Sequence, residues 1–149
     1  SASTYSASDS SEVPGGVRTG DVGKGFENAW TQIQDAGVGL TVLLDTPRPR
    51  MDVPECIAEN EENLIECAAD RTEAVKFSGH GRLLDAAEAT DTETVDMTDA
   101  ICSPEACAPV VGGVIVWRDS HHITATYAET LAGSLQRKLQ QDSSLEFSE

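Results

Sequence analysis

The sequence predicts an α/β fold, a three-layer α/β/α sandwich around a mainly parallel sheet. Two short and continuous apolar runs, residues 38–46 and 110–117, are typical of strands that are buried on both faces. Segments with the apolar spacing of helices precede and follow these runs. Strands that alternate with helices indicate β-α-β connections, because parallel neighbours need a crossover between them.

The first helix is predicted to begin at Phe26. Its apolar side chains recur at intervals of three and four, at Phe26, Ala29, Trp30, Ile33 and Ala36. Trp30 lies on this face and is expected in the core. Gly37 is expected to end the helix. The buried strand 38–46 follows, and the three prolines within 46–56 predict a loop.

Further elements are predicted along the rest of the chain. A helix is expected over about 60–76, where these side chains share one face: Leu64, Ile65, Ala68 and Ala69. Another helix is expected near 81–90, and a short strand that ends in a turn within 94–102. After the strand 110–117, the last helix is marked by Ile123, Tyr127, Leu131, Leu135 and Leu139. Thr124 is the predicted N-cap of that helix.

The chain is expected to be part of one domain. Its 149 residues suffice for a single core. Residues 1–24, rich in Ser, Gly and Asp, are expected to form an irregular entry segment. Residues 25–140 carry the periodic segments, and 141–149 form a polar tail. No apolar run approaches the roughly 18–20 residues that span a membrane.

Acidic residues dominate the charge. There are 26 Asp and Glu against 10 Lys and Arg, which gives a formal net charge of −16 at pH 7. Such a chain repels phosphate backbones, so nucleic acid is not an expected partner. The carboxylates are spread along the sequence, which favours a solvated surface. They form no loop of recognisable metal-ligand spacing, so we predict neither a metal nor a cofactor.

Four cysteines fall into two local pairs. Cys56 and Cys67 bracket ten residues, and Cys102 and Cys107 bracket four, so neither pair has the C-x-x-C spacing of a zinc site. The even count predicts two short disulfides, Cys56–Cys67 and Cys102–Cys107, in an oxidising compartment. The alternative is four reduced, buried thiols in a cytosolic protein.

Asp119-x-x-His122 is the strongest candidate for catalysis. It lies between the strand 110–117 and the last helix, where one short turn can bring the carboxylate to the ring. In a hydrolase triad, the histidine takes the nucleophile's proton and the carboxylate fixes the tautomer of the ring. The alternative is a structural motif that caps the helix. The loop 45–50 also follows a strand, so both loops are expected at the carboxyl edge of the sheet.

Several other polar and aromatic residues are considered for the site. Arg48 and Arg50 either bind a carboxylate or flank the prolines at the surface. His121 is expected to point toward substrate or solvent. Trp117 either lines the site or packs in the core. His80, between two glycines, is expected to be exposed and not catalytic. No nucleophile is evident, since Gly20-Asp21 is not followed by serine.

Three segments together resemble one known family. They are "VVGGVIVWRDSHHITATYAETLAGSL", "LLDTPRPRMDVPEC" and "ICSPEACAPVVGG". They are similar to the final part of SGNH-type hydrolase domains that are fused to membrane-bound type-three acyltransferases of bacteria, particularly actinobacteria. The resemblance covers roughly residues 25–140 and includes the cysteine positions. It implies a flavodoxin-like sandwich in which Asp119 and His122 belong to a Ser-His-Asp triad.

The family's serine lies in a Gly-Asp-Ser motif on the first strand of the domain. This motif is absent from the sequence. The resemblance therefore implies that the nucleophile-bearing strand belongs to an N-terminal segment outside this chain, and that this segment is a partner of the chain. We therefore expect residues 25–140 to be the C-terminal portion of an SGNH domain.

The resemblance also implies a function. We expect an extracytoplasmic domain of a membrane O-acyltransferase, with the acyltransferase domain in cis and a membrane tether before residue 1. It would transfer an acyl group, such as acetyl, to a hydroxyl of an envelope glycan or glycolipid. Two alternatives stay open: a secreted SGNH esterase, and a non-catalytic glycan-binding or interaction module of the same fold.

Overall fold

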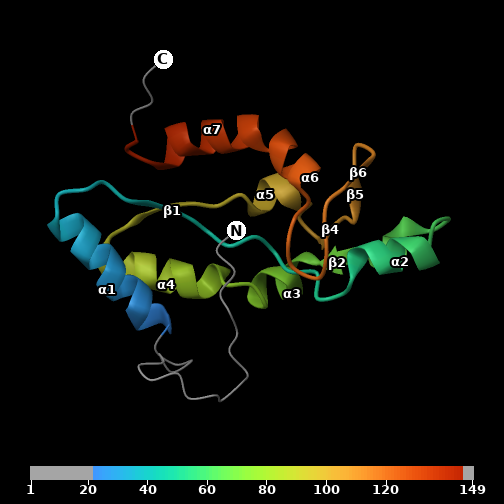
Figure 1. The fold of residues 1–149 in the computed structure, drawn as a ribbon, viewed down its shortest axis with the longest axis horizontal. Helices are drawn as coiled ribbons and strands as arrows, with labels where there is room; N and C mark the ends of the chain where they lie inside the picture. The colour runs from blue at the N-terminus through green and yellow to red at the C-terminus, as the bar shows by residue number, and fades with distance from the viewer. Residues whose placement is uncertain (1–21, 146–149) are drawn as a thin grey trace.

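A computed structural model describes residues 22–145 of the chain (Figure 1). Helix α1 (Val22–Asp35) buries Trp30, as predicted, but begins before Phe26. The helix ends before Gly37, whose φ of 75° is readily adopted by glycine. Of the predicted entry segment, residues 22–24 are helical, and residues 1–21 lie outside the described part of the chain.

The strands β1 (Thr41–Leu43) and β3 (Glu93–Val95) form a parallel pair, in which Thr41 lies opposite Glu93. The predicted strand 38–46 is thus confirmed in its centre, but it is not buried on both faces, because Leu43 is 47% exposed. Helix α4 (His80–Thr90) matches the predicted helix near 81–90 and packs against α1. A core cluster joins these elements through Trp30, Leu44, Leu83, Ala86 and Ala87.

Helices lie on both sides of the β1–β3 pair. In Figure 1, α1 and α4 lie below β1, and α7 (Ala132–Asp142) lies above it. Helix α7 contacts β3 directly. This arrangement agrees with the α/β class. Among residues 22–145 the parallel sheet has two strands, so the larger three-layer sandwich stays a prediction.

The predicted loop 46–56 is confirmed as far as Asp52, and its last residues are helical. The predicted single helix 60–76 is wrong, because several short elements replace it. The segment folds into α2 (Val53–Glu59), the 3₁₀ helix η2 (Leu64–Cys67), β2 (Ala69–Asp70) and α3 (Arg71–Lys76). Asp52 caps α2, and Asp70 caps α3 through its carboxylate. These caps start two short helices where a single long one was expected.

Both predicted disulfides are present in the structure. Cys56–Cys67 joins α2 to η2, and Cys102–Cys107 joins the end of α5 (Thr98–Ile101) to β4 (Ala106–Cys107). Strand β4 pairs antiparallel with β2. The two disulfides therefore stabilise the region beside the two-stranded β2–β4 sheet, and they exclude the alternative of four free thiols.

The predicted strand 110–117 is instead a β-hairpin. Strands β5 (Val110–Val111) and β6 (Val114–Ile115) pair antiparallel around Gly112 and Gly113, whose φ values are 57° and 79°. Two consecutive positive φ angles are typical of a two-residue hairpin turn. The chain then enters the core, where Val116 and Trp117 are fully buried.

The predicted last helix is divided in two. Helix α6 (Ala125–Thr130) is followed by α7 after Leu131. Thr124 caps α6 as predicted, because its Oγ1 accepts a hydrogen bond from Tyr127 N at 3.1 Å. The predicted tail begins inside α7, and residues 146–149 lie outside the described part. Between residues 22 and 145, no helix combines the length and apolarity that a membrane crossing requires.

Candidate active site

The loop 118–122 is a short turn that is closed at its base. Trp117 and Ile123 form an antiparallel β-bridge, and Arg118 N donates to the carbonyl of His122 at 2.8 Å. Thr124 N donates to Val116 O at 2.8 Å. Trp117 anchors one end of the turn in the core, and Thr124 fixes the other end at the start of α6.

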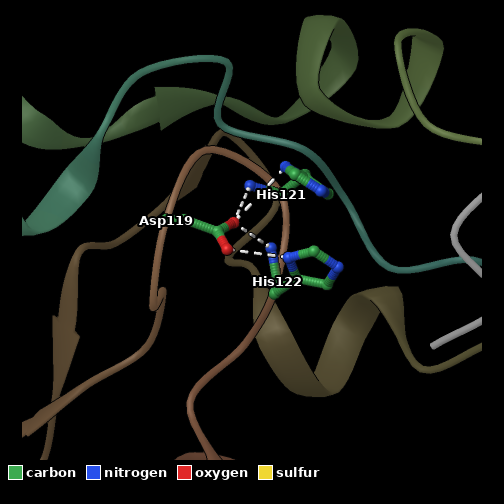
Figure 2. Close-up of side chains that lie close together, drawn as sticks. All are labelled: Asp119, His121 and His122. Atoms are coloured by element: carbon green, nitrogen blue, oxygen red, sulfur yellow. Dashed lines mark hydrogen bonds and ion pairs between the residues drawn. The ribbon is translucent and has the colours of Figure 1, made fainter. Parts of the chain in front are cut away.

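Within this turn, Asp119 and His122 form a close pair (Figure 2). One carboxylate oxygen, Oδ1, accepts from the backbone N–H groups of His121 and His122, both at 2.8 Å. The other, Oδ2, lies 2.7 Å from His122 Nδ1. An ionised carboxylate can only accept, so Nδ1 carries the proton. In the neutral ring, Nε2 is then a free acceptor, which is the tautomer that a general base needs.

The electrostatics of the turn keep Asp119 ionised. Partial burial raises its pKa, but hydrogen bonds from the His122 ring and from two backbone N–H groups outweigh burial and hold the pKa well below its usual range. About 31% of the Asp119 side chain and 27% of the His122 side chain is exposed. The Asp119 carboxylate is therefore ionised at neutral pH, and both side chains are accessible to a reacting group.

The sequence suggested that the His121 side chain points away from the pair. In the structure its ring instead lies beside that of His122. Its ring centroid lies 3.8 Å from that of His122, at an interplanar angle of 44°. Its Nδ1 lies 3.0 Å from Ser120 Oγ and 3.3 Å from Asp119 Oδ1. Both imidazoles therefore share one carboxylate, and one ligand atom from each of these three side chains lies within 4.8 Å of the others.

The proline-rich loop after β1 contacts this turn. The expected reason, two loops at the carboxyl edge of one sheet, is wrong, because the strands before the turn form a separate hairpin. Arg50 N donates to Ser120 O at 3.1 Å. Arg50 has a positive φ of 66°, and its guanidinium lies 3.7 Å from the Phe77 ring centroid. Arg48 is half-buried, and its backbone N donates to Ala74 O at 2.9 Å. The loop thus touches the turn through its backbone.

Trp117 is fully buried, and its Nε1 donates to Ala108 O at 3.3 Å. Of its two predicted roles, its surroundings support packing. A side chain with no exposed surface cannot contact a substrate in this conformation. Trp117 therefore anchors the start of the turn in the core.

His80 is not the exposed loop residue that the sequence predicted. It begins α4, its side chain is 14% exposed, and its Nε2 lies 3.1 Å from Asp96 Oδ2. The hydrogen bond from His80, together with Thr98 N on Oδ1, lowers the pKa of Asp96 well below its usual range, although burial opposes this. The two residues are sixteen positions apart, so no local motif announces this second Asp–His pair.

The described residues supply no evident nucleophile for His122. Ser120 Oγ hydrogen-bonds to His121, and all four cysteines are in disulfides. Between residues 22 and 145, no serine or threonine hydroxyl hydrogen-bonds to the His122 ring. The geometry therefore provides a histidine with a free acceptor nitrogen and the carboxylate that orients its ring.

Comparison with known proteins identifies the family. The model of the SGNH domain (fused to AT3 domains) matches residues 2–137, which include the Asp119–His122 turn and both disulfides. No curated protein and no solved structure matches the chain. Since the match covers most of the 149 residues, it confirms the resemblance seen in the sequence. The chain belongs to the family of SGNH domains that are fused to AT3 domains.

Proposed function

We propose that this chain supplies the acid–base part of an acyl-transfer site, in an extracytoplasmic SGNH domain of a membrane O-acyltransferase. The observation that carries this proposal is the 2.7 Å contact between His122 Nδ1 and Asp119 Oδ2 in a chain of this family. That contact leaves Nε2 free to accept a proton. The accessible position of the pair supports the same role.

In the proposed reaction, His122 Nε2 takes the proton of a serine hydroxyl as the serine oxygen attacks the acyl donor. The imidazolium then protonates the leaving group, and an acyl-serine forms. In the second half, Nε2 takes the proton of a sugar hydroxyl, whose oxygen attacks the acyl-serine. The proton returns to the serine as the ester bond breaks. Asp119 stays ionised throughout and stabilises the charged ring.

The serine in this proposal belongs to the Gly-Asp-Ser motif of the family. The 149 residues contain no such motif, so we place it on a segment outside this chain. We propose that the AT3 acyltransferase domain, joined in cis, brings the acyl group to the site. The acceptor would be an envelope glycan or glycolipid, with Arg48 and His121 as candidate contacts for it. The chemistry needs no metal or other cofactor.

The two disulfides support an extracytoplasmic location. Such bonds persist in oxidising compartments and are rare in the cytosol. A membrane tether through the AT3 domain would hold the SGNH domain near the envelope surface. This location matches the proposed acceptors.

The proposal is tested in membranes that contain the full-length protein, with a radiolabelled acyl donor. We expect label in the envelope glycan fraction for the wild type and its loss in His122→Ala. The matched control is His80→Ala, which removes the other Asp–His pair and is expected to keep transfer. Turnover by His122→Ala within tenfold of wild type would contradict the proposed base. Label released as free acid would point to the esterase instead.

A further inference from the structure

Three side chains with metal-ligating atoms converge in the turn 118–122. His121 Nδ1 lies 3.3 Å from Asp119 Oδ1, and His122 Nδ1 lies 2.7 Å from Asp119 Oδ2. Zinc bonds to nitrogen and oxygen are about 2.0–2.2 Å, so tetrahedral geometry separates neighbouring ligand atoms by about 3.3–3.6 Å. The His121–Asp119 contact already meets that spacing, and the His122–Asp119 contact is about 0.6 Å shorter than its lower end. The three ligand atoms all lie within 4.8 Å of one another.

The donor set selects a class of ion. Two imidazoles and one carboxylate, with an open fourth position, are the ligands of many zinc sites. Imidazole suits zinc, copper and nickel, whereas calcium and magnesium prefer oxygen ligands. The chain has a net charge of −16, so its carboxylates can attract any cation. Zinc binding at the two imidazoles can be told apart from this attraction, because calcium prefers oxygen ligands.

The turn is arranged in advance for such an ion. Asp119 is held by two backbone N–H groups, and the two rings lie 3.8 Å apart on the same carboxylate. Ordering these groups therefore costs little on binding. Arg118 is the facing cation that opposes binding, with Nε 3.6 Å from Asp119 Oδ2. Its side chain is 66% exposed and can turn toward solvent.

We propose that Asp119, His121 and His122 bind one divalent transition-metal ion of the zinc class, and that this ion blocks proton transfer by His122. An ion on Nδ1 forces the neutral ring into the tautomer with a proton on Nε2, which cannot accept another. His122 then ceases to be a base, while the fold stays intact.

The binding step is tested by calorimetry on the untagged chain with its disulfides intact, titrated with zinc and separately with calcium. We expect one tight zinc site per chain and no equivalent calcium site. His121→Ala is expected to weaken zinc binding at least about tenfold, because it removes one of three ligands. His80→Ala is the matched control and should bind like wild type. Equal affinity of wild type and His121→Ala would overturn the proposal.

A second measurement needs no variant. Zinc below one equivalent is expected to shift the ring proton resonances of His121 and His122 and to leave those of His80 unchanged. No shift, or an equal shift of all three histidines, would overturn the site. Neither experiment contains an acyl donor or acceptor, so the binding proposal does not rest on the proposed function. In the full-length protein, inhibition by zinc that a chelator reverses is the result expected for the blocking step.

Discussion

Replacement of Asp119 by Asn tests the role of the carboxylate with almost no change in shape. In the wild type, Oδ1 accepts from two backbone N–H groups, and Oδ2 accepts from His122 Nδ1. The amide oxygen of Asn must take the Oδ1 position, because the two backbone donors need an acceptor. The amide NH₂ then faces the His122 ring. Nδ1 becomes the acceptor, and the ring proton moves to Nε2.

This change of tautomer removes the base. For a carboxylate-to-amide change of this kind in a serine hydrolase triad, kcat falls about 10⁴-fold. That factor corresponds to about 5 kcal/mol of transition-state stabilisation. The backbone hydrogen bonds of the turn persist, so we expect the folded structure to be retained.

The assay has two parts. Nitrogen NMR of the chain reports the tautomer of His122, which we expect to carry its proton on Nδ1 in wild type and on Nε2 in Asp119→Asn. Acyl transfer by the full-length protein reports the rate. Asp96→Asn makes the same substitution in the His80 pair and serves as the control, with transfer expected near wild type. An unchanged His122 tautomer, or a loss of rate below tenfold, would contradict the role of Asp119 in fixing the tautomer.

Three further predictions concern stability, each measured by urea unfolding. Cys56→Ser with Cys67→Ser opens a loop with a sequence separation of 11 and should cost about 3 kcal/mol in the chain-entropy model; no loss would contradict this. Thr124→Val removes a hydroxyl that accepts from Tyr127 N and donates to Ile115 O. The free energy of unfolding should fall by about 1–2 kcal/mol, and an unchanged urea midpoint would argue against the cap. Asp96 has a lowered pKa when folded, so its stabilisation is present above its ordinary pKa of about 3.9 and is lost as the pH falls below that value. Between pH 6 and pH 3, the free energy of unfolding should therefore fall less in Asp96→Asn than in wild type. An identical fall would contradict the lowered pKa of Asp96.

The parts of the fold that sequence periodicity predicted are those held by one continuous apolar face. Helices α1 and α4 fall into this group, as does the centre of β1. Their burial depends on spacing within one segment, which a sequence shows directly. The break between α6 and α7 at Leu131 was missed, because the apolar spacing continues across it.

Other errors came from local signals that were present but given the wrong weight. Gly112-Gly113 between two apolar pairs is a hairpin signal, yet the run was interpreted as one buried strand. Asp70 with Glu73 three positions later marks the start of α3, and Asp52 before Pro54 marks the start of α2. Capping residues therefore locate these short helices better than apolar spacing does.

The Asp119–His122 pair was predictable because its two members are three residues apart in one turn. The position of His121 depends on the turn's backbone, which the sequence did not specify. The contact from Arg50 to Ser120 and the pair of His80 with Asp96 join segments far apart in sequence. Such contacts arise from tertiary packing and carry no local pattern.

We propose that Asp119 and His122 activate a serine nucleophile. The most direct test is labelling of the full-length protein with a serine-reactive fluorophosphonate, followed by mass spectrometry of the adduct. We predict one labelled serine, in a Gly-Asp-Ser motif outside these 149 residues, and loss of that label in His122→Ala. Equal labelling of wild type and His122→Ala, or no labelled serine in a protein that still transfers acyl groups, would contradict this role.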